Sequence, residues 1–217
     1  MNIYNIGDKN TLLRNFIAEI RDIEIQKDSL RFRRNLERVG EILAYEISKE
    51  LSYVSKDITT PLGVSNEHVI LQYPVLATIL RAGLPLHQGF LNYFDNAENT
   101  FISAYRDEKD DGSFDVKIEY MSSPSIESKT VILCDPMLAS GSSMVLALKA
   151  LLTTGNPTHI HIAAVIASHQ GIEYLSQNLP FQNCTLWVAA IDEKMTSNSY
   201  IVPGLGDAGD LAFGKKL

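Results

Sequence analysis

Four short apolar stretches, separated by helix-like segments, constrain the fold of this chain more than any other feature. They are Val75–Leu80, Val131–Cys134, Ile160–Ala167 and Thr185–Ala190. None shows the apolar–polar alternation of a sheet with one solvated face. Helix-like segments separate them at 84–94, 142–152 and 171–178, and a further strand is expected at 101–105. Fully apolar strands alternating with helices predict an α/β fold, with a mainly parallel sheet flanked by helices on both faces.

Two helices are expected before this sheet, within residues 10–52. Asn10 is expected to cap the first, whose apolar face runs from Leu12 to Ile20, and the second begins near Asp28. The second helix has an apolar stripe at helical spacing that predicts core positions: Leu36, Val39, Leu43 and Ile47. Its arginines, at 31, 33, 34 and 38, are expected to pair with Glu37, Glu41 and nearby acids, with effector or subunit contacts as the alternative.

Two polar segments interrupt the apolar pattern, at 58–72 and 108–120. Both are expected to form β-hairpin arms outside the sheet. The run 107–112 is rich in Asp, Lys and Gly and predicts a solvated turn. The alternative for that run is an acid that helps to place a metal ion.

The chain is expected to be a single domain over residues 1–217. A chain of 217 residues fits one domain, and we find no repeat, low-complexity tract or linker. The core sheet is expected over about 75–190, followed by a carboxy-terminal segment at 192–214.

The net charge, the cysteines and the length of the apolar runs limit where the chain is expected to act and what it is expected to bind. The formal charge of −7 disfavours a broad contact with nucleic acid. Cys134 and Cys184 both lie in apolar stretches, which suits a reducing compartment better than a disulfide framework. No apolar run approaches the roughly 20 residues that span a bilayer, and no secretory leader is visible. We expect a cytoplasmic protein without a membrane or nucleic-acid partner.

The segment from 131 to 143 carries the clearest chemical signal. An apolar strand ends at Asp135, a loop of small residues follows, and a helix opens near Ser142. The amino end of a helix offers free N–H groups and the positive end of the helix dipole, so it binds phosphate readily. Gly141 allows close approach of the backbone, and the serine hydroxyls add donors. Asp135 is placed to hold ribose hydroxyls or a metal-bound water.

The same segment fits a sugar-linked monophosphate better than other phosphate ligands. No lysine follows the loop glycine as in a triphosphate-binding loop, and the spacing is not that of a dinucleotide fingerprint. An ordinary strand-to-helix connection rich in small residues is the alternative, because such turns are common.

Four segments of the chain resemble the uracil phosphoribosyltransferases, which belong to the type I phosphoribosyltransferases. They are RFR with its helix at 31–45, ILRAGL at 79–84, DPMLASGSS at 135–143 and YIVPGLGDAGD at 200–210. They occur in the family's order and span most of the chain. The glycine-rich block at 200–210 is the most discriminating, because other phosphoribosyltransferases lack it.

The resemblance implies a function and a set of site residues. It implies transfer of ribose 5-phosphate from phosphoribosyl pyrophosphate (PRPP) to N1 of uracil, which gives UMP and pyrophosphate in pyrimidine salvage. Arg81 and Arg106 look like the pair that grips the pyrophosphate, and with Asp135 and Asp207 they make up the implied catalytic set. The implied PRPP site comprises Arg81, Arg106, Asp135, Pro136, Met137, Leu138, Ala139, Ser140, Gly141, Ser142, Ser143 and Asp207. The implied uracil site comprises Ile201, Gly206, Asp207 and Ala208.

The resemblance also implies partners. Mg²⁺ would be the cofactor, carried by the pyrophosphate rather than by a protein metal site. A homodimer or higher homo-oligomer is typical of the family. The sequence leaves open whether GTP acts as an effector. Ser140 and Ser142 depart from the family, which usually has threonine and glycine there.

These residues suit the chemistry that the resemblance implies. Cleavage of PRPP leaves a pyrophosphate whose charge guanidinium groups can pair bidentately. The glycines at 204, 206 and 209 let a backbone approach uracil and match its two carbonyls and its N3–H. The short turn at Arg81–Gly83 is expected to contain a cis non-proline peptide bond, as in related enzymes.

Two alternatives for function remain at this point. A purine-base phosphoribosyltransferase would keep the chemistry, but the 200–210 block speaks against it. A PRPP-sensing RNA-binding regulator would use the same loop without turnover, but the charge of −7 speaks against it. His159 and His161 alternate on one strand without a third ligand at metal spacing, so they are expected to be ordinary strand residues.

Overall fold

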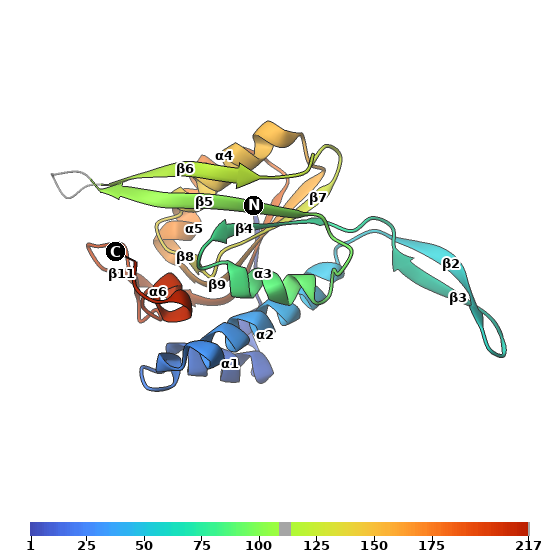
Figure 1. Ribbon diagram of the computed structural model, residues 1–217, viewed down its shortest axis with the longest axis horizontal. Coiled ribbons are helices and arrows are strands. Elements are labelled where there is room, and N and C mark those ends of the chain that lie inside the picture. The colour runs from blue at the N-terminus through green and yellow to red at the C-terminus, as the bar shows by residue number, and fades with distance from the viewer. Residues whose placement is uncertain (109–113, 217) are drawn as a thin grey trace.

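The computed structural model of the chain describes residues 1–108 and 114–216, and the side chains of 104–117 are outside the described part. Its centre is one sheet with the strand order β1-β10-β9-β7-β4-β5-β6, and β8 pairs with β9 beside this path (Figure 1). The strands of this sheet are β1 (Asn2–Asn5), β4 (Val75–Leu80), β5 (Asn99–Glu108), β6 (Phe114–Ser122), β7 (Thr130–Cys134), β8 (Met137–Leu138), β9 (His159–Ser168) and β10 (Cys184–Asp192).

All pairings in this sheet are parallel except that of β5 with β6. The helices are α1 (Leu12–Arg21), α2 (Ser29–Ser48), α3 (Leu84–Leu91), α4 (Ser142–Leu151), α5 (His169–Asn178) and α6 (Ala208–Phe213). Short 3₁₀ turns occupy Ile6–Asp8, Ile25–Lys27 and Leu152–Thr154. The expected α/β class is confirmed.

Both faces of the sheet are buried, each in its own apolar cluster. Successive residues of β7 point to opposite sides: Ile132 packs with α1, α2 and α3, whereas Val131 and Leu133 pack with α4 and α5. Figure 1 shows these two groups of helices on opposite faces of the sheet. This double cover explains why the strands are continuously apolar. The stripe of α2 belongs to the first cluster, and all four of its residues are buried as expected.

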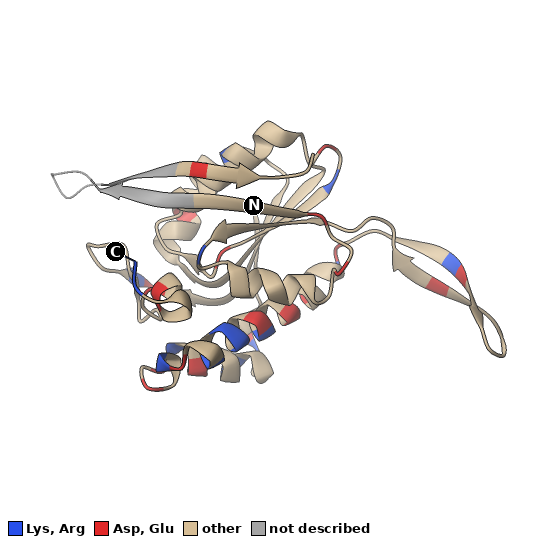
Figure 2. Ribbon diagram, in the orientation of Figure 1, with Lys and Arg blue, Asp and Glu red and all other residues tan. Residues whose placement is uncertain are grey.

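The two helices at the start of the chain are joined by charged side chains. Figure 2 shows basic and acidic residues interleaved along α1 and α2. Arg31 pairs with Glu19 at 2.8 Å, and Arg34 pairs with Glu37 at 2.5 Å. Arg33 instead donates to the carbonyl of Ala212, which ties α2 to α6.

Two expectations about the elements are wrong, and one strand was missed. Thr11, not Asn10, stands at the N-cap of α1, where β-region backbone angles suit it, and its side chain makes no capping bond. The hairpin expected at 108–120 is present, but its described residues do not lie outside the sheet, because β6 pairs with β5 and forms the edge of the sheet. Ile118 and Met121 of β6 pack against the α4 side, which holds the strand there. The strand β1 at the other edge was not expected.

The 58–72 arm is confirmed, although it begins earlier than expected. Strands β2 (Tyr53–Thr60) and β3 (Gly63–Ile70) form a separate antiparallel pair. Figure 1 shows this pair projecting from the body of the molecule. The turn expected at 107–112 lies largely outside the described residues. A third small sheet pairs β11 (Lys194–Met195) with β12 (Ile201–Val202). Within the described residues, no helix is long and apolar enough to cross a membrane.

Candidate active site

A pocket of about 840 Å³ opens at the carboxyl ends of β4 and β7. Three segments line most of it. They are 79–82 at the end of β4 and just after it, the loop from Asp135 to Met144, and the stretch from Gly206 to Asp210. Ligands of open parallel sheets bind at this edge. The glycine-rich block of the carboxy-terminal segment and the strand–loop–helix segment near residue 140 therefore meet at one pocket.

The loop after β7 is held in shape from below by α5. The Ser168 hydroxyl donates to the Ala139 carbonyl at 2.7 Å and accepts from the Gly171 N–H at 2.8 Å. Gly171 comes so close that a Cβ there would lie 2.1 Å from the Ala139 carbonyl oxygen. Pro136 belongs to the loop, and its carbonyl oxygen accepts from the N–H groups of Val165 and Ile166 on β9. The loop is thus fixed before any ligand binds.

The loop ends in a sharp turn into α4. Gly141 has φ of +83°, in the left-handed region that favours glycine. The hydroxyls of Ser140 and Ser142 lie 2.8 Å apart and bond to each other. These two serines thus contact each other across this turn. Ser142 begins α4 and, like Pro136, does not line the pocket, whereas the other residues of 135–143 do.

The carboxyl of Asp135 is surrounded by protein on all sides but the pocket. Burial raises its pKa from 3.8 to about 7, and a hydrogen bond from the Met137 N–H opposes this in part. That bond is 3.3 Å long. A carboxyl with such a pKa changes its charge near neutral pH, which is typical of functional sites.

The turn after β4 presents Arg81 to the pocket. The Leu80–Arg81 peptide bond is cis, which confirms the expectation for this turn. Gly83 packs so tightly that a Cβ there would lie 2.1 Å from Oγ1 of Thr78. The Arg81 guanidinium donates to Asp210 at 3.4 Å and to the Gly214 carbonyl at 3.2 Å. Arg106 lies in β5, and its side chain is outside the described part of the structure.

The carboxy-terminal segment reaches the pocket through a chain of tight turns. Gly204 and Gly206 have φ of +59° and +91°, and the Val202–Pro203 bond is cis. Asp207 caps α6, because its side chain accepts from the Asp210 N–H at 2.9 Å. Gly206, Asp207 and Ala208 line the pocket, but Ile201 is buried in β12 and does not.

Several pocket residues were not singled out from sequence. Ser199 and Tyr200 lie just before or within the 200–210 block, and their position could have suggested them. Ser103 and Lys216 also line the pocket. Lys216 carried no signal beyond its charge, because only folding brings the carboxy-terminal end beside the β4 turn.

The two histidines of β9 do not line this pocket, and His161 is buried whereas His159 is partly exposed. The Trp187 indole donates to Nδ1 of His161 at 3.1 Å. Burial, followed by the neighbouring His159, lowers the pKa of His161 to about 3. His159 bonds with the Thr185 hydroxyl at 3.0 Å.

The sequence as a whole matches known proteins closely. A family model described as uracil phosphoribosyltransferase matches residues 8–215. A uracil phosphoribosyltransferase of Porphyromonas gingivalis is 58% identical over 217 residues, covering 100% of both chains. A protein of the same name from Sulfolobus acidocaldarius is 36% identical over 212 residues, covering 94% of this chain and 96% of its own. The solved structure of the AQ2163 protein from Aquifex aeolicus is similar, with a TM-score of 0.86 and 27% identity over 98% of each chain.

Proposed function

Because the chain belongs to the uracil phosphoribosyltransferase family, it is a pentosyltransferase that makes UMP from uracil and PRPP, and we propose how its residues divide this work. The reaction breaks the bond between C1 of ribose and pyrophosphate, forms a bond from C1 to N1 of uracil, and releases the N1 proton to the pyrophosphate or to water. The protein must therefore stabilise the charge of the departing pyrophosphate and hold the base against C1.

Arg81 and Arg106 bind the pyrophosphate in this proposal. Arg81 lies at the pocket, and among the described residues its guanidinium is bound to Asp210 and the Gly214 carbonyl, so a polyanion can take over these donors. Its partner carboxylate is single, whereas pyrophosphate offers several oxygens for bidentate contact. Arg106 enters on the resemblance and on its place in β5, the strand that pairs with β4.

The loop from Asp135 to Ser143 binds the ribose 5-phosphate. Its support is the open amino end of α4 with the serine hydroxyls around Gly141. Asp135 holds the ribose hydroxyls as a carboxylate, which accepts stronger hydrogen bonds than a neutral group.

Magnesium fits this arrangement as an ion that arrives with PRPP. Mg²⁺ in such sites keeps several waters and is held by one or two carboxylates together with substrate phosphates. Asp135 is the carboxylate of the β7 loop that faces the pocket. When bound, the ion would neutralise part of the pyrophosphate charge.

Uracil is read by the backbone of the carboxy-terminal segment. Gly206 and Ala208 leave the main chain open toward the pocket, and Asp207 fixes it to α6 while facing the phosphoribosyl side. Ile201 would contribute through its main chain, since its side chain is buried. A backbone that matches the donors and acceptors of uracil leaves buried polar groups unpaired when cytosine enters, which permits discrimination of roughly 10⁴-fold.

The observation that carries this proposal is the meeting of 135–143 and 206–208 in one pocket. The test incubates the protein with PRPP, Mg²⁺ and each of five bases, and follows pyrophosphate release. We expect turnover with uracil, a loss of roughly 10⁴-fold with cytosine, and a loss worth about 1–3 kcal/mol with thymine, whose extra methyl only adds bulk. Comparable turnover with cytosine would refute backbone reading, and turnover with a purine would refute the base assignment.

The setting of the enzyme also belongs to this proposal. A homodimer or higher homo-oligomer is supported by the projecting β2–β3 arm and its exposed apolar side chains. A cytoplasmic location is supported by two free, buried cysteines, Cys134 and Cys184. Adding GTP to the same assay decides whether it is an effector.

A further inference from the structure

Arg21, at the end of α1, joins three parts of the chain that are distant in sequence. Its guanidinium binds both carboxylate oxygens of Asp192, at 2.8 Å each, and donates to the Gly204 carbonyl at 3.0 Å. Asp192 in turn accepts from the Gly204 N–H at 3.0 Å. Both polar backbone groups of Gly204 are thus bound by one ion pair. We call these three residues the Arg21 junction.

The Arg21 junction is buried, and the geometry around it is closely constrained. Asp192 is 7% exposed, and the Arg21 side chain is 21% exposed. Gly204 has φ of +59°, and a Cβ there would lie 2.1 Å from the Ile201 carbonyl oxygen. Bidentate guanidinium–carboxylate pairs fix direction as well as distance, which a lysine cannot do. The turn at Gly204 therefore has one permitted arrangement.

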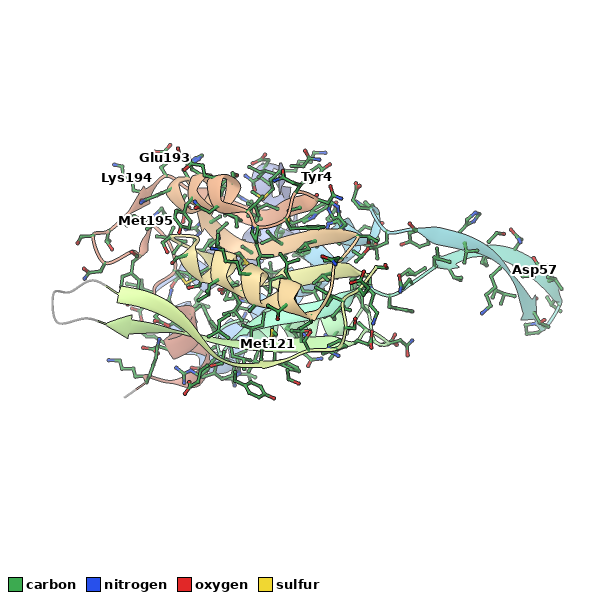
Figure 3. The ribbon with its side chains drawn as sticks, turned by 90° about the horizontal axis from the view of Figure 1, so that it is seen from above. Tyr4, Asp57, Met121, Glu193, Lys194 and Met195 are labelled. Carbon is green, nitrogen blue, oxygen red and sulfur yellow. The ribbon has the colours of Figure 1, made fainter. Side chains whose placement is uncertain are left out.

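The junction closes a long excursion of the chain. Asp192 ends β10, and the chain returns at Gly204 only after residues 193–203, most of which are exposed. Figure 3 shows Glu193, Lys194 and Met195, which follow Asp192, at the end of the molecule opposite the arm that carries Asp57. Ser199 and Tyr200 of this excursion also line the pocket, and the junction fixes where the residues that follow it begin. Those residues, 206–210, line the pocket.

We propose that Arg21 and Asp192 are positioning residues for uracil: the Arg21 junction sets where the backbone of 206–208 faces the base. Neither residue lines the pocket, so both act through Gly204. The proposal rests on the assignment of 206–208 to uracil made above. The loop that binds ribose phosphate is held separately, by Ser168 and Gly171. A loss of the junction should therefore affect uracil more than PRPP.

The test compares Arg21→Met with Arg31→Met in steady-state assays of both substrates. Methionine keeps much of the packing of the side-chain stem and removes the charge. Arg31 is a matched control, because it also binds a carboxylate at 2.8 Å, and that carboxylate belongs to Glu19 of α1. For Arg21→Met we expect the KM for uracil to rise at least about tenfold while the KM for PRPP changes less than about threefold. Arg31→Met should change neither.

Two more variants keep the proposal open to refutation if Arg21→Met folds poorly. Arg21→Lys keeps the charge and should give an intermediate KM for uracil, with faster amide exchange in 201–207 and unchanged exchange in β7. Asp192→Asn should resemble Arg21→Met. Equal rises in both KM values, or an unchanged KM for uracil together with unchanged exchange at 201–207, would overturn the proposal.

A separate variant distinguishes failure of this inference from failure of the uracil assignment. Ala208→Val adds bulk at a residue that lines the pocket. If Ala208→Val leaves the KM for uracil unchanged, the assignment of 206–208 is wrong. If it raises that KM while Arg21→Met does not, only the role of the Arg21 junction is wrong.

Discussion

Burial raises the pKa of the Asp135 carboxyl from 3.8 to about 7, and this has a cost for the folded protein. An unfolded chain releases this proton near pH 4, whereas the native chain keeps it until about pH 7. The native state binds more protons between these values, so the contribution of Asp135 to stability falls as the pH rises through this window. Above pH 7 the charged carboxylate is present in a site that disfavours it.

Replacement of Asp135 by asparagine should therefore stabilise the enzyme at high pH and impair catalysis. Asparagine retains an oxygen that can accept from the Met137 N–H, and it carries no charge. We expect a gain in unfolding free energy on the order of 1–4 kcal/mol at pH 8, since each pKa unit is worth about 1.4 kcal/mol. The gain should vanish near pH 4. Denaturant titrations at both pH values measure it.

The activity of the same variant gives the second half of this prediction. An amide is a weaker acceptor for ribose hydroxyls than a carboxylate, so kcat/KM for PRPP should fall at least about tenfold. A variant that is more stable at pH 8 and fully active would show that Asp135 has no part in binding the ribose.

For single residues, the chemical role was easier to predict from the sequence than the contacts that the side chain makes. Asp135 was recognisable because an acid directly follows an apolar strand and precedes a helix. The contact of Arg81 with Asp210 was not recognisable, because it joins residues 129 positions apart. Lys216 was missed for the same reason. The role of Ile201 stays a prediction, since its side chain points into the core.

Among the elements, α5 shapes the loop from Asp135 to Ser143 although it contributes nothing to the pocket lining. Its capping residue Ser168 binds the Ala139 carbonyl, and Gly171 leaves room for that carbonyl. The alanine side chain in a Gly171→Ala variant would lie 2.1 Å from the Ala139 oxygen, so helix and loop cannot both stay in place. The loop thus depends on a helix that follows it by about thirty residues in sequence.

We expect Gly171→Ala to raise the KM for PRPP at least about tenfold, because the displaced loop no longer matches the phosphate. Gly63→Ala is the matched control, since a Cβ at Gly63 meets nothing within 4 Å. Initial-rate measurements with PRPP varied at saturating uracil compare the two. An unchanged KM in Gly171→Ala would mean that α5 moves instead of the loop.

The elements that pattern alone predicted well are those buried on both sides. The strands β4, β7, β9 and β10 are continuously apolar because helices cover both faces, and no other environment suits them. The two edge strands of the sheet were harder to predict from the sequence. β1 is only four residues long and its side chains are mostly exposed, so its pairing with β10 leaves no apolar signal. The polar sequence of β6 predicts a free arm, whereas its place is set by pairing with β5.

At the scale of the whole molecule, the β2–β3 arm has no core of its own. An isolated two-stranded hairpin is marginally stable in water, and three or more strands are usually needed. Its tip exposes Leu62 completely and Val64 to 69%. Such a surface is consistent with burial against a second copy of the chain.

Replacement of Leu62 and Val64 by aspartate should lower the mass of the assembly without unfolding the chain. Both side chains are exposed in the single chain, so their loss removes little from its own packing. Light scattering on size-separated protein gives the mass. Leu12→Asp is the control, because Leu12 is also an exposed apolar residue, at 63%, but lies on α1. A monomeric wild-type protein would refute the assembly, and an unchanged mass in the double variant would place the contact elsewhere.

The bonds of Arg81 to Asp210 and to the Gly214 carbonyl mean that its guanidinium is already paired within the protein. Asp210 already serves as counter-ion, so an incoming anion gains only the difference between its own attraction and that of the resident carboxylate. Small monovalent anions of the surrounding salt should gain little by this exchange. An anion that brings several charged oxygens at once gains much more. Selectivity for the highly charged substrate would then arise in part from the contact between Arg81 and Asp210, which the substrate has to replace.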